Sequence, residues 1–212
     1  MNTFVRANGL TIVLTVMFLA SLFGMVLTGH AHFGHQLAEH GLPGLSVFEY
    51  ILTGDFVSAV FENWESEFLQ MAVYVILTAV LFQKGSAESR DPDEPEREHD
   101  ALSGKARRVS PVRSFLYSHS LGLVLTMLFA VSFVLHWIAS TKAANAEQLM
   151  HGRAAKTFFQ YIGDSQLWFE CFQNWQSEFL STGVLVVLSI FLRQQGSPES
   201  KPVAARNDET GA

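Results

Sequence analysis

Charged residues are scarce in this sequence. Only 16% of its 212 residues are Asp, Glu, Lys or Arg, whereas 49% are hydrophobic. This composition is lean in charge for a soluble domain of such a size. No basic patch is present, so nucleic acid is not an expected partner. The excess apolar content therefore has to be located along the chain.

Cysteine occurs only once, as Cys171, so no intrachain disulfide can form and the residue is expected to serve packing. The sequence also lacks a phosphate-binding glycine loop, a nucleophile elbow, a Cys-x-x-Cys pair and an HExxH helix. We therefore expect neither enzymatic activity nor a cofactor.

The apolar residues gather in four blocks, at 9–28, 68–82, 121–140 and 179–192. The first and third blocks contain no Lys, Arg, Asp or Glu and are long enough, at about 1.5 Å per residue, to cross about 30 Å of hydrocarbon. The other two are shorter and, by length alone, also fit the buried helices of a soluble protein.

An internal duplication resolves this ambiguity. When the sequence is shifted by 111 residues, residues 62–69 (ENWESEFL) align with 173–180 (QNWQSEFL), and 85–89 (GSAES) align with 196–200 (GSPES). Each copy holds two apolar blocks, so the chain enters both copies from the same side of the membrane. Two copies of this kind are parallel and are related by an axis along the membrane normal.

We therefore predict an all-α integral membrane protein with four transmembrane helices, arranged as two parallel tandem repeats of a two-helix unit, with short interfacial helices in the outer loops. The first repeat covers 1–89, with membrane helices at about 9–28 and 64–83 and an outer loop at 29–62. The second covers 114–200, with helices at about 118–140 and 175–193 and an outer loop at 141–173. The charged linker 90–113 and the tail 201–212 are expected to be disordered.

The basic residues predict the orientation of the chain. All but three of the 14 Lys and Arg lie in the amino terminus, the linker and the tail. By the positive-inside rule, both termini and the linker are cytoplasmic.

The repeated polar element supplies a candidate intramembrane site, with one glutamate in each copy just below the outer surface of the membrane. An ionised carboxylate at that depth needs a partner, water or a proton. An asparagine four residues earlier and a neighbouring serine can donate hydrogen bonds to it. The site residues are Asn63, Ser66 and Glu67 in the first copy and Asn174, Ser177 and Glu178 in the second.

A structural reading of the same element stays open. In that reading Asn and Glu bond the backbone of the outer loops, while Trp64 and Trp175 anchor the helices in the interface. Thr53 and Asp164 occupy equivalent positions, and both are residue types that cap helix N-termini.

Histidines form a second candidate site in the first outer loop. His30, His32, His35 and His40 have spacings that could hold a zinc, copper or nickel ion. Only His40 has an equivalent in the second copy, which is His151. Solvated loop histidines are the alternative.

The repeated Asn-Trp-x-Ser-Glu-Phe-Leu element carries a family resemblance, together with Ala7-Asn8-Gly9-Leu10 before the first helix and Gln83-Lys84-Gly85-Ser86 after the second. The chain resembles a bacterial membrane-protein family known only as domain of unknown function 6766. This resemblance implies a multi-pass protein of the bacterial inner (plasma) membrane, and it implies no activity or catalytic residue.

The sequence leaves three functional hypotheses. The first is a structural or accessory role in the inner membrane, with the lipid bilayer and a homo-oligomer as the expected partners. The second is a small proton, cation or ligand pathway built on Glu67 and Glu178. The third is metal binding by the histidines of the outer loop.

Overall fold

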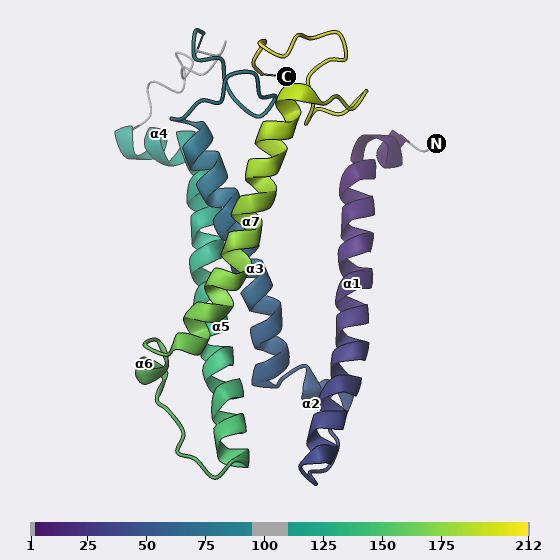
Figure 1. Cartoon of the computed structure of the whole chain (residues 1–212), viewed down its shortest axis with the longest axis vertical. Coiled ribbons are helices and arrows are strands. Elements are labelled where there is room, and N and C mark those ends of the chain that lie inside the picture. Colours follow the sequence, from purple (N-terminus) through teal and green to yellow (C-terminus); the bar gives the residue numbers. More distant parts are fainter. Residues whose placement is uncertain (1–2, 95–109, 212) are drawn as a thin grey trace. The chain divides into compact units, whose positions relative to one another are not determined.

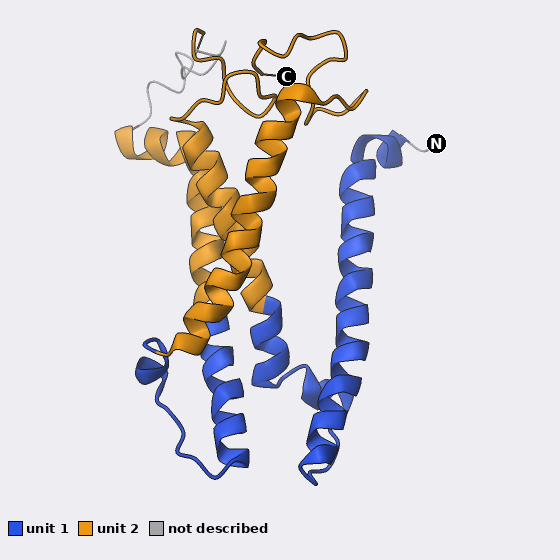
Figure 2. Ribbon diagram, in the orientation of Figure 1, with its two compact units in different colours: residues 1–60, 135–163 blue, residues 61–134, 164–212 orange. Residues whose placement is uncertain are grey.

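The computed structural model describes residues 3–94 and 110–211, in which every regular element is an α-helix (Figure 1). These residues form two compact units, shown in Figure 2. Unit 1 comprises residues up to 60 together with 135–163, and unit 2 comprises 61–134 and 164–212. Most of the linker that the sequence predicts to be disordered lies outside the described residues.

Two helices are long and apolar enough to cross a membrane. They are α1 (Thr3–Glu39) and α5 (Ser120–Met150). The most apolar window of α1 has none of its residues buried inside the protein. Leu10 and Phe23 of this helix are 75% and 64% exposed, as expected for side chains that face lipid rather than water.

Unit 1 contains α1, α2 (Val47–Tyr50), the first turns of α3, the last turns of α5 and α6 (Phe158–Tyr161). Tyr50 of α2 packs so closely on α1 that a Cβ at Gly29 would lie 2.2 Å from its hydroxyl oxygen. At the residues 111 positions later, the hydroxyl groups of Tyr161 and Ser140 are hydrogen-bonded at 2.9 Å. A buried tyrosine thus holds each short helix against the longer helix that precedes it.

Unit 2 contains the rest of α3 (Gly54–Thr78), α4 (Pro111–Ser118), the first turns of α5, α7 (Ser165–Phe191) and the segments that follow α3 and α7. The predicted caps are confirmed at the N-termini of α3 and α7. The Thr53 hydroxyl accepts from the Phe56 amide at 3.3 Å, and the Asp164 carboxylate accepts from the Gln166 amide at 3.1 Å.

Helices α1 and α5 extend about ten residues beyond the predicted membrane segments at 9–28 and 118–140. Hydropathy marks where lipid contact ends, whereas a helix continues until its backbone is capped. Both ends are glycine caps: Gly41 and Gly152 have φ of 68°, and the amide that follows each glycine bonds back to Leu37 or Gln148. This is the Schellman arrangement, which satisfies the last carbonyl groups of a helix.

Other local structures also recur at positions 111 residues apart. Capping boxes begin α2 at Ser46 and α6 at Thr157. Gly85 and Gly196 follow α3 and α7 with φ of 85° and 83°. The sequence correspondence therefore extends to caps and turns in which single backbone conformations agree.

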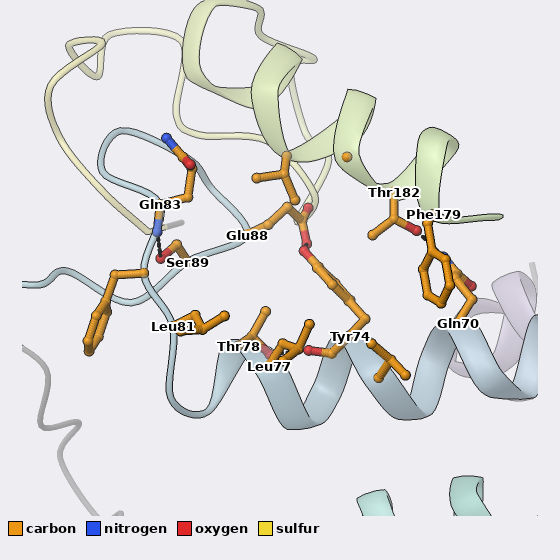
Figure 3. Close-up of a pocket in the computed structure, with 14 residues that line it drawn as sticks. Gln70, Tyr74, Leu77, Thr78, Leu81, Gln83, Glu88, Ser89, Phe179 and Thr182 are labelled. Atoms are coloured by element: carbon orange, nitrogen blue, oxygen red, sulfur yellow. Dashed lines mark hydrogen bonds between the residues drawn. The ribbon is translucent and has the colours of Figure 1, made fainter. Parts of the chain in front are cut away.

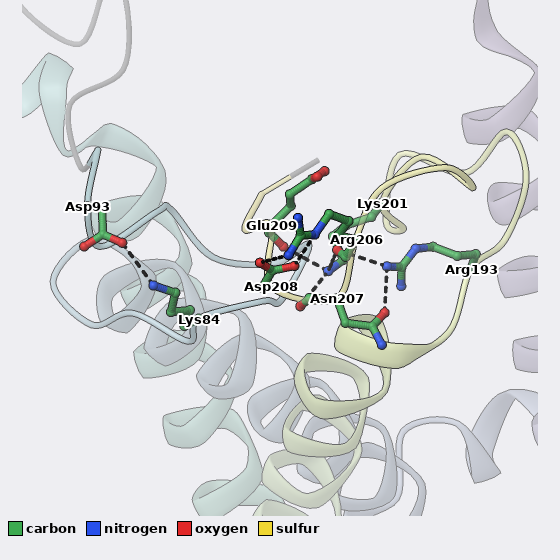
Figure 4. A network of polar contacts seen from close by, with 8 residues as sticks. All are labelled: Lys84, Asp93, Arg193, Lys201, Arg206, Asn207, Asp208 and Glu209. Atoms are coloured by element: carbon green, nitrogen blue, oxygen red, sulfur yellow. Dashed lines mark hydrogen bonds and ion pairs between the residues drawn. The ribbon is translucent and has the colours of Figure 1, made fainter.

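The tail from residue 201 differs from the disorder that the sequence predicts. Lys201 is only 1% exposed, and its ammonium group donates to the carbonyl oxygens of Arg206, Asn207 and Glu209 at 3.0, 3.2 and 2.9 Å (Figure 4). The Gly211 amide donates to the Ser86 carbonyl oxygen at 2.9 Å. One buried cation thus gathers the carbonyl groups of the tail and holds it against the segment that follows α3.

Candidate functional site

The predicted polar residues lie on α3 and α7 within unit 2, but their hydroxyl groups do not serve the glutamates. Ser66 donates to the Asn63 carbonyl oxygen, and Ser177 to the Asn174 carbonyl oxygen, both at 2.8 Å. A serine inside a helix commonly satisfies its hydroxyl in this way, by bonding a carbonyl group one turn earlier. The two serines are therefore structural residues of their own helices.

Asn174 also differs from its expected role. Its amide donates to Glu62 Oε1 at 2.6 Å and to the Glu170 carbonyl oxygen at 3.3 Å, rather than to Glu178. The bond to Glu62 joins α7 to α3, so this asparagine connects two helices instead of stabilising a carboxylate on its own helix.

The buried carboxylate of the repeated element is Glu65, not Glu67. Glu65 is fully buried, whereas Glu67 is exposed and Glu178 is partly exposed. Positions two apart in a helix lie about 200° apart around its axis, so only one of the two side chains can face the neighbouring helices. A carboxylate oxygen of Glu65 lies within 4.8 Å of Sγ of Cys171, which is also buried.

Burial of Glu65 escaped the prediction because its equivalent in the second copy is Gln176, which has no charge. The helical phase of the apolar residues around it was the available signal. Ser66 and Ala72 share its low exposure, and together these residues mark the packed side of α3.

Glu67 and Glu178 nevertheless influence each other. The negative charge of Glu67 acts unfavourably on a negative charge at Glu178. Two carboxylates in this relation ionise together only at a cost, which a proton or a cation relieves. This interaction is the feature of the predicted site that remains relevant to ion or proton binding.

The two predicted aromatic anchors are surrounded differently. The Trp64 ring contacts Phe61, with ring centroids 5.2 Å apart. The Trp175 ring lies among Phe129, Trp168 and Phe172, at centroid distances of 6.3, 6.5 and 5.4 Å. Trp175 is thus part of an aromatic cluster that packs α7 against α5.

Helices α3 and α7 are joined by polar bonds along their length in unit 2. Besides the bond between Glu62 and Asn174, the Gln70 amide donates to the Thr182 hydroxyl. Past the end of α3, the Ser86 and Ser189 hydroxyl groups are hydrogen-bonded at 2.8 Å. These three pairs, which we call the α3–α7 polar ties, advance in the same direction along both helices, so α3 and α7 run parallel.

A cavity of about 330 Å³ lies between α3 and α7, bounded by the segment after α3 (Figure 3). Its lining is mostly apolar, with Gln70, Tyr74, Glu88 and Thr182 as polar members. The Tyr74 hydroxyl donates to Glu88 Oε2 at 3.0 Å. One carboxyl group therefore faces a largely apolar space.

Glu88 interacts with Glu199, the residue at the equivalent position of the second copy. Burial raises the pKa of Glu88, the hydrogen bond from Tyr74 opposes this effect, and the charge and a hydrogen bond of Glu199 raise the pKa further. A carboxyl pair of this kind favours holding a proton, and its titration belongs to the pair rather than to either residue.

The four histidines of the first outer loop have separate partners. His30 donates from Nε2 to the Leu45 carbonyl oxygen at 2.7 Å, and its ring lies on Tyr50. Nε2 of His32 lies 3.3 Å from the Gln36 side-chain amide. Among the residues that the structure describes, no metal-binding group combines these histidines with one another. The predicted four-histidine site is therefore not assembled, because their spacing spreads the residues around α1.

The described fold thus defines an all-helical protein with two helices able to span a membrane. Comparison with known proteins gives the family. The chain belongs to the family described as "Domain of unknown function (DUF6766)", whose model matches residues 1–212. No curated protein and no solved structure matches the chain.

Proposed function

We propose that this protein is a multi-pass protein of the bacterial inner membrane with a structural or accessory role. In this proposal α1, α3, α5 and α7 all cross the membrane and form two parallel copies of a two-helix unit. The recurring caps and turns support the two copies. Exposed apolar side chains on α7, such as Leu180 and Phe191, support a lipid-facing position for this shorter helix.

The α3–α7 polar ties are the observation that carries the structural role. Lipid offers no hydrophobic driving force between helices, so packing and interhelical hydrogen bonds hold membrane helices together. Here the polar groups of the repeated element and its surroundings are used for that purpose. A protein whose intramembrane polar groups join its helices is built for a stable assembly.

The topology is tested by reporter fusions. A reporter that is active only in the cytoplasm is fused after Ser89, and the same reporter is fused in the segment between α5 and α6, after Lys156. We expect activity from the first fusion only, because both termini and the linker are cytoplasmic in this proposal. Activity from the second fusion alone would reverse the proposed orientation.

The second candidate function is a proton or cation pathway. The unfavourable interaction between the charges of Glu67 and Glu178 favours it. Four helices leave little room for a pore within one chain, so this function would require a homo-oligomer with a passage between protomers.

Flux measurements separate the two functions. The Glu67→Gln/Glu178→Gln variant is reconstituted in proteoliposomes beside the wild type and a matched Glu209→Gln control in the tail. Proton or cation flux that is lost only in the double variant supports the pathway. Flux at the level of empty liposomes for every variant, with unchanged stability, discards the pathway and leaves the structural role.

A further inference from the structure

A second polar cavity of about 330 Å³ lies in unit 1, where the C-terminal ends of α1 and α5 meet the first turn of α3. His40 and His151 both line it, and their ring centroids are 5.8 Å apart. These histidines are 111 residues apart, so they occupy the same position in the two copies. Each directly precedes the glycine that caps its helix.

The other polar members of the cavity are mostly acidic. Glu39, Asp55 and Glu147 line it, and no lysine or arginine does. Partial burial raises the pKa of Asp55, and the charge of Glu147 raises it further. The C-terminal ends of two helices add partial negative charge from their last carbonyl groups. The cavity therefore favours a cation.

We infer that this cavity is a binding site for a divalent transition metal such as zinc, held by His40 and His151 with carboxylate oxygens from Asp55 and Glu147. Imidazole and carboxylate together suit zinc and its neighbours better than calcium or magnesium. The site differs from a cluster of histidines in one loop, because one histidine comes from each copy of the repeat.

The distance between the rings agrees with a shared metal. With a Zn–N bond of about 2.0–2.1 Å, each ring centroid lies about 3.2 Å from the ion, so two rings on one ion have centroids about 5 Å apart at a tetrahedral angle and about 6.4 Å apart in line. The observed 5.8 Å lies between these limits. The carboxylates are exposed side chains, which can turn toward an ion without repacking a core.

The hydrogen bond of His40 also suits a ligand. Its Nδ1 lies 2.9 Å from the Gln36 carbonyl oxygen, so Nδ1 carries the proton and donates it. The Nε2 lone pair is then available to a metal. Metal-binding histidines typically donate from the other ring nitrogen to a carbonyl or carboxylate oxygen, which fixes the tautomer and the ring orientation.

The test is zinc titration of the full chain in lipid nanodiscs, purified without a histidine tag, treated with chelator and followed by calorimetry. We expect one zinc per chain, with affinity at least tenfold weaker in His40→Gln and in His151→Gln. The matched control is His35→Gln, which changes an exposed histidine of α1 that does not line the cavity. It should bind zinc as the wild type does.

Absence of binding by the wild type would overturn the inference, and so would equal affinity in the wild type and both cavity variants. Melting temperatures in chelator check that the variants fold. If a variant fails to fold, the cobalt spectrum of the wild type decides. Intense visible bands of a four-coordinate ion support the site, whereas the weak spectrum of hydrated cobalt rejects it. The outcome does not depend on the structural or transport role proposed above.

Discussion

Replacement of Gly54 by alanine tests how closely α3 approaches α5 in unit 1. A Cβ at Gly54 would lie 2.6 Å from the Ala143 amide nitrogen, 2.7 Å from the Ala139 carbonyl oxygen and 2.9 Å from Cβ of Lys142. Two of these atoms belong to the backbone of a helix, so they cannot move aside without shifting α5. Overpacking of this kind costs about 1–3 kcal/mol, and we expect Gly54→Ala to lower the free energy of unfolding by that amount.

The matched control is Gly24→Ala on α1, where a new Cβ would meet no atom of the protein within 4 Å. Alanine is favoured over glycine inside a helix by about 0.8–1.0 kcal/mol, so this variant should be as stable as the wild type or more stable. Both variants are measured by reversible unfolding in mixed detergent micelles with increasing SDS. If Gly54→Ala proves as stable as Gly24→Ala, the close approach of α3 and α5 is refuted.

Three further predictions concern unit 2. Asn174→Ala removes the bond to Glu62 and should lower the free energy of unfolding by about 0.5–2 kcal/mol; an unchanged SDS titration would contradict the tie. Because the pKa of Glu88 is raised by burial and by Glu199, its contribution to stability is present at acidic pH and is lost as pH rises through the folded pKa. Glu88→Gln should flatten this dependence, and a wild type that melts higher as pH rises would refute it. Lys201→Met leaves three carbonyl groups without their shared donor, so limited proteolysis should cut the tail faster than in the wild type; equal cleavage rates would refute the role of the ammonium group.

Part of the fold follows directly from the residue pattern. Long runs of apolar residues without charge can form only helices in a membrane, and α1 and α5 are such helices. The caps at Thr53 and Asp164 were predictable because capping depends on a side chain and the amides two or three residues later. Features set by neighbouring residues are therefore readable from the sequence.

Other features depend on how segments distant in sequence meet. Glu65 and Glu67 both belong to the repeated element, and only the packing of α3 against other helices decides which of them is buried. The tail has a polar composition typical of disorder, yet Lys201 orders it through carbonyl groups that no side-chain pattern reveals. The pairing of His40 with His151 likewise requires two helix ends to meet. Equivalent positions in an internal repeat were the available signal for that pair.

The bond between Gln70 and Thr182 has a consequence for the ancestry of the chain. The residue 111 positions after Gln70 is Ser181, and the residue 111 positions before Thr182 is Met71, so exchanging the roles of the two halves does not recreate the bond. A gene that encoded one half twice would yield a protein without this fastening. Since the duplication, each half has become fitted to the other, and neither can now replace its sibling.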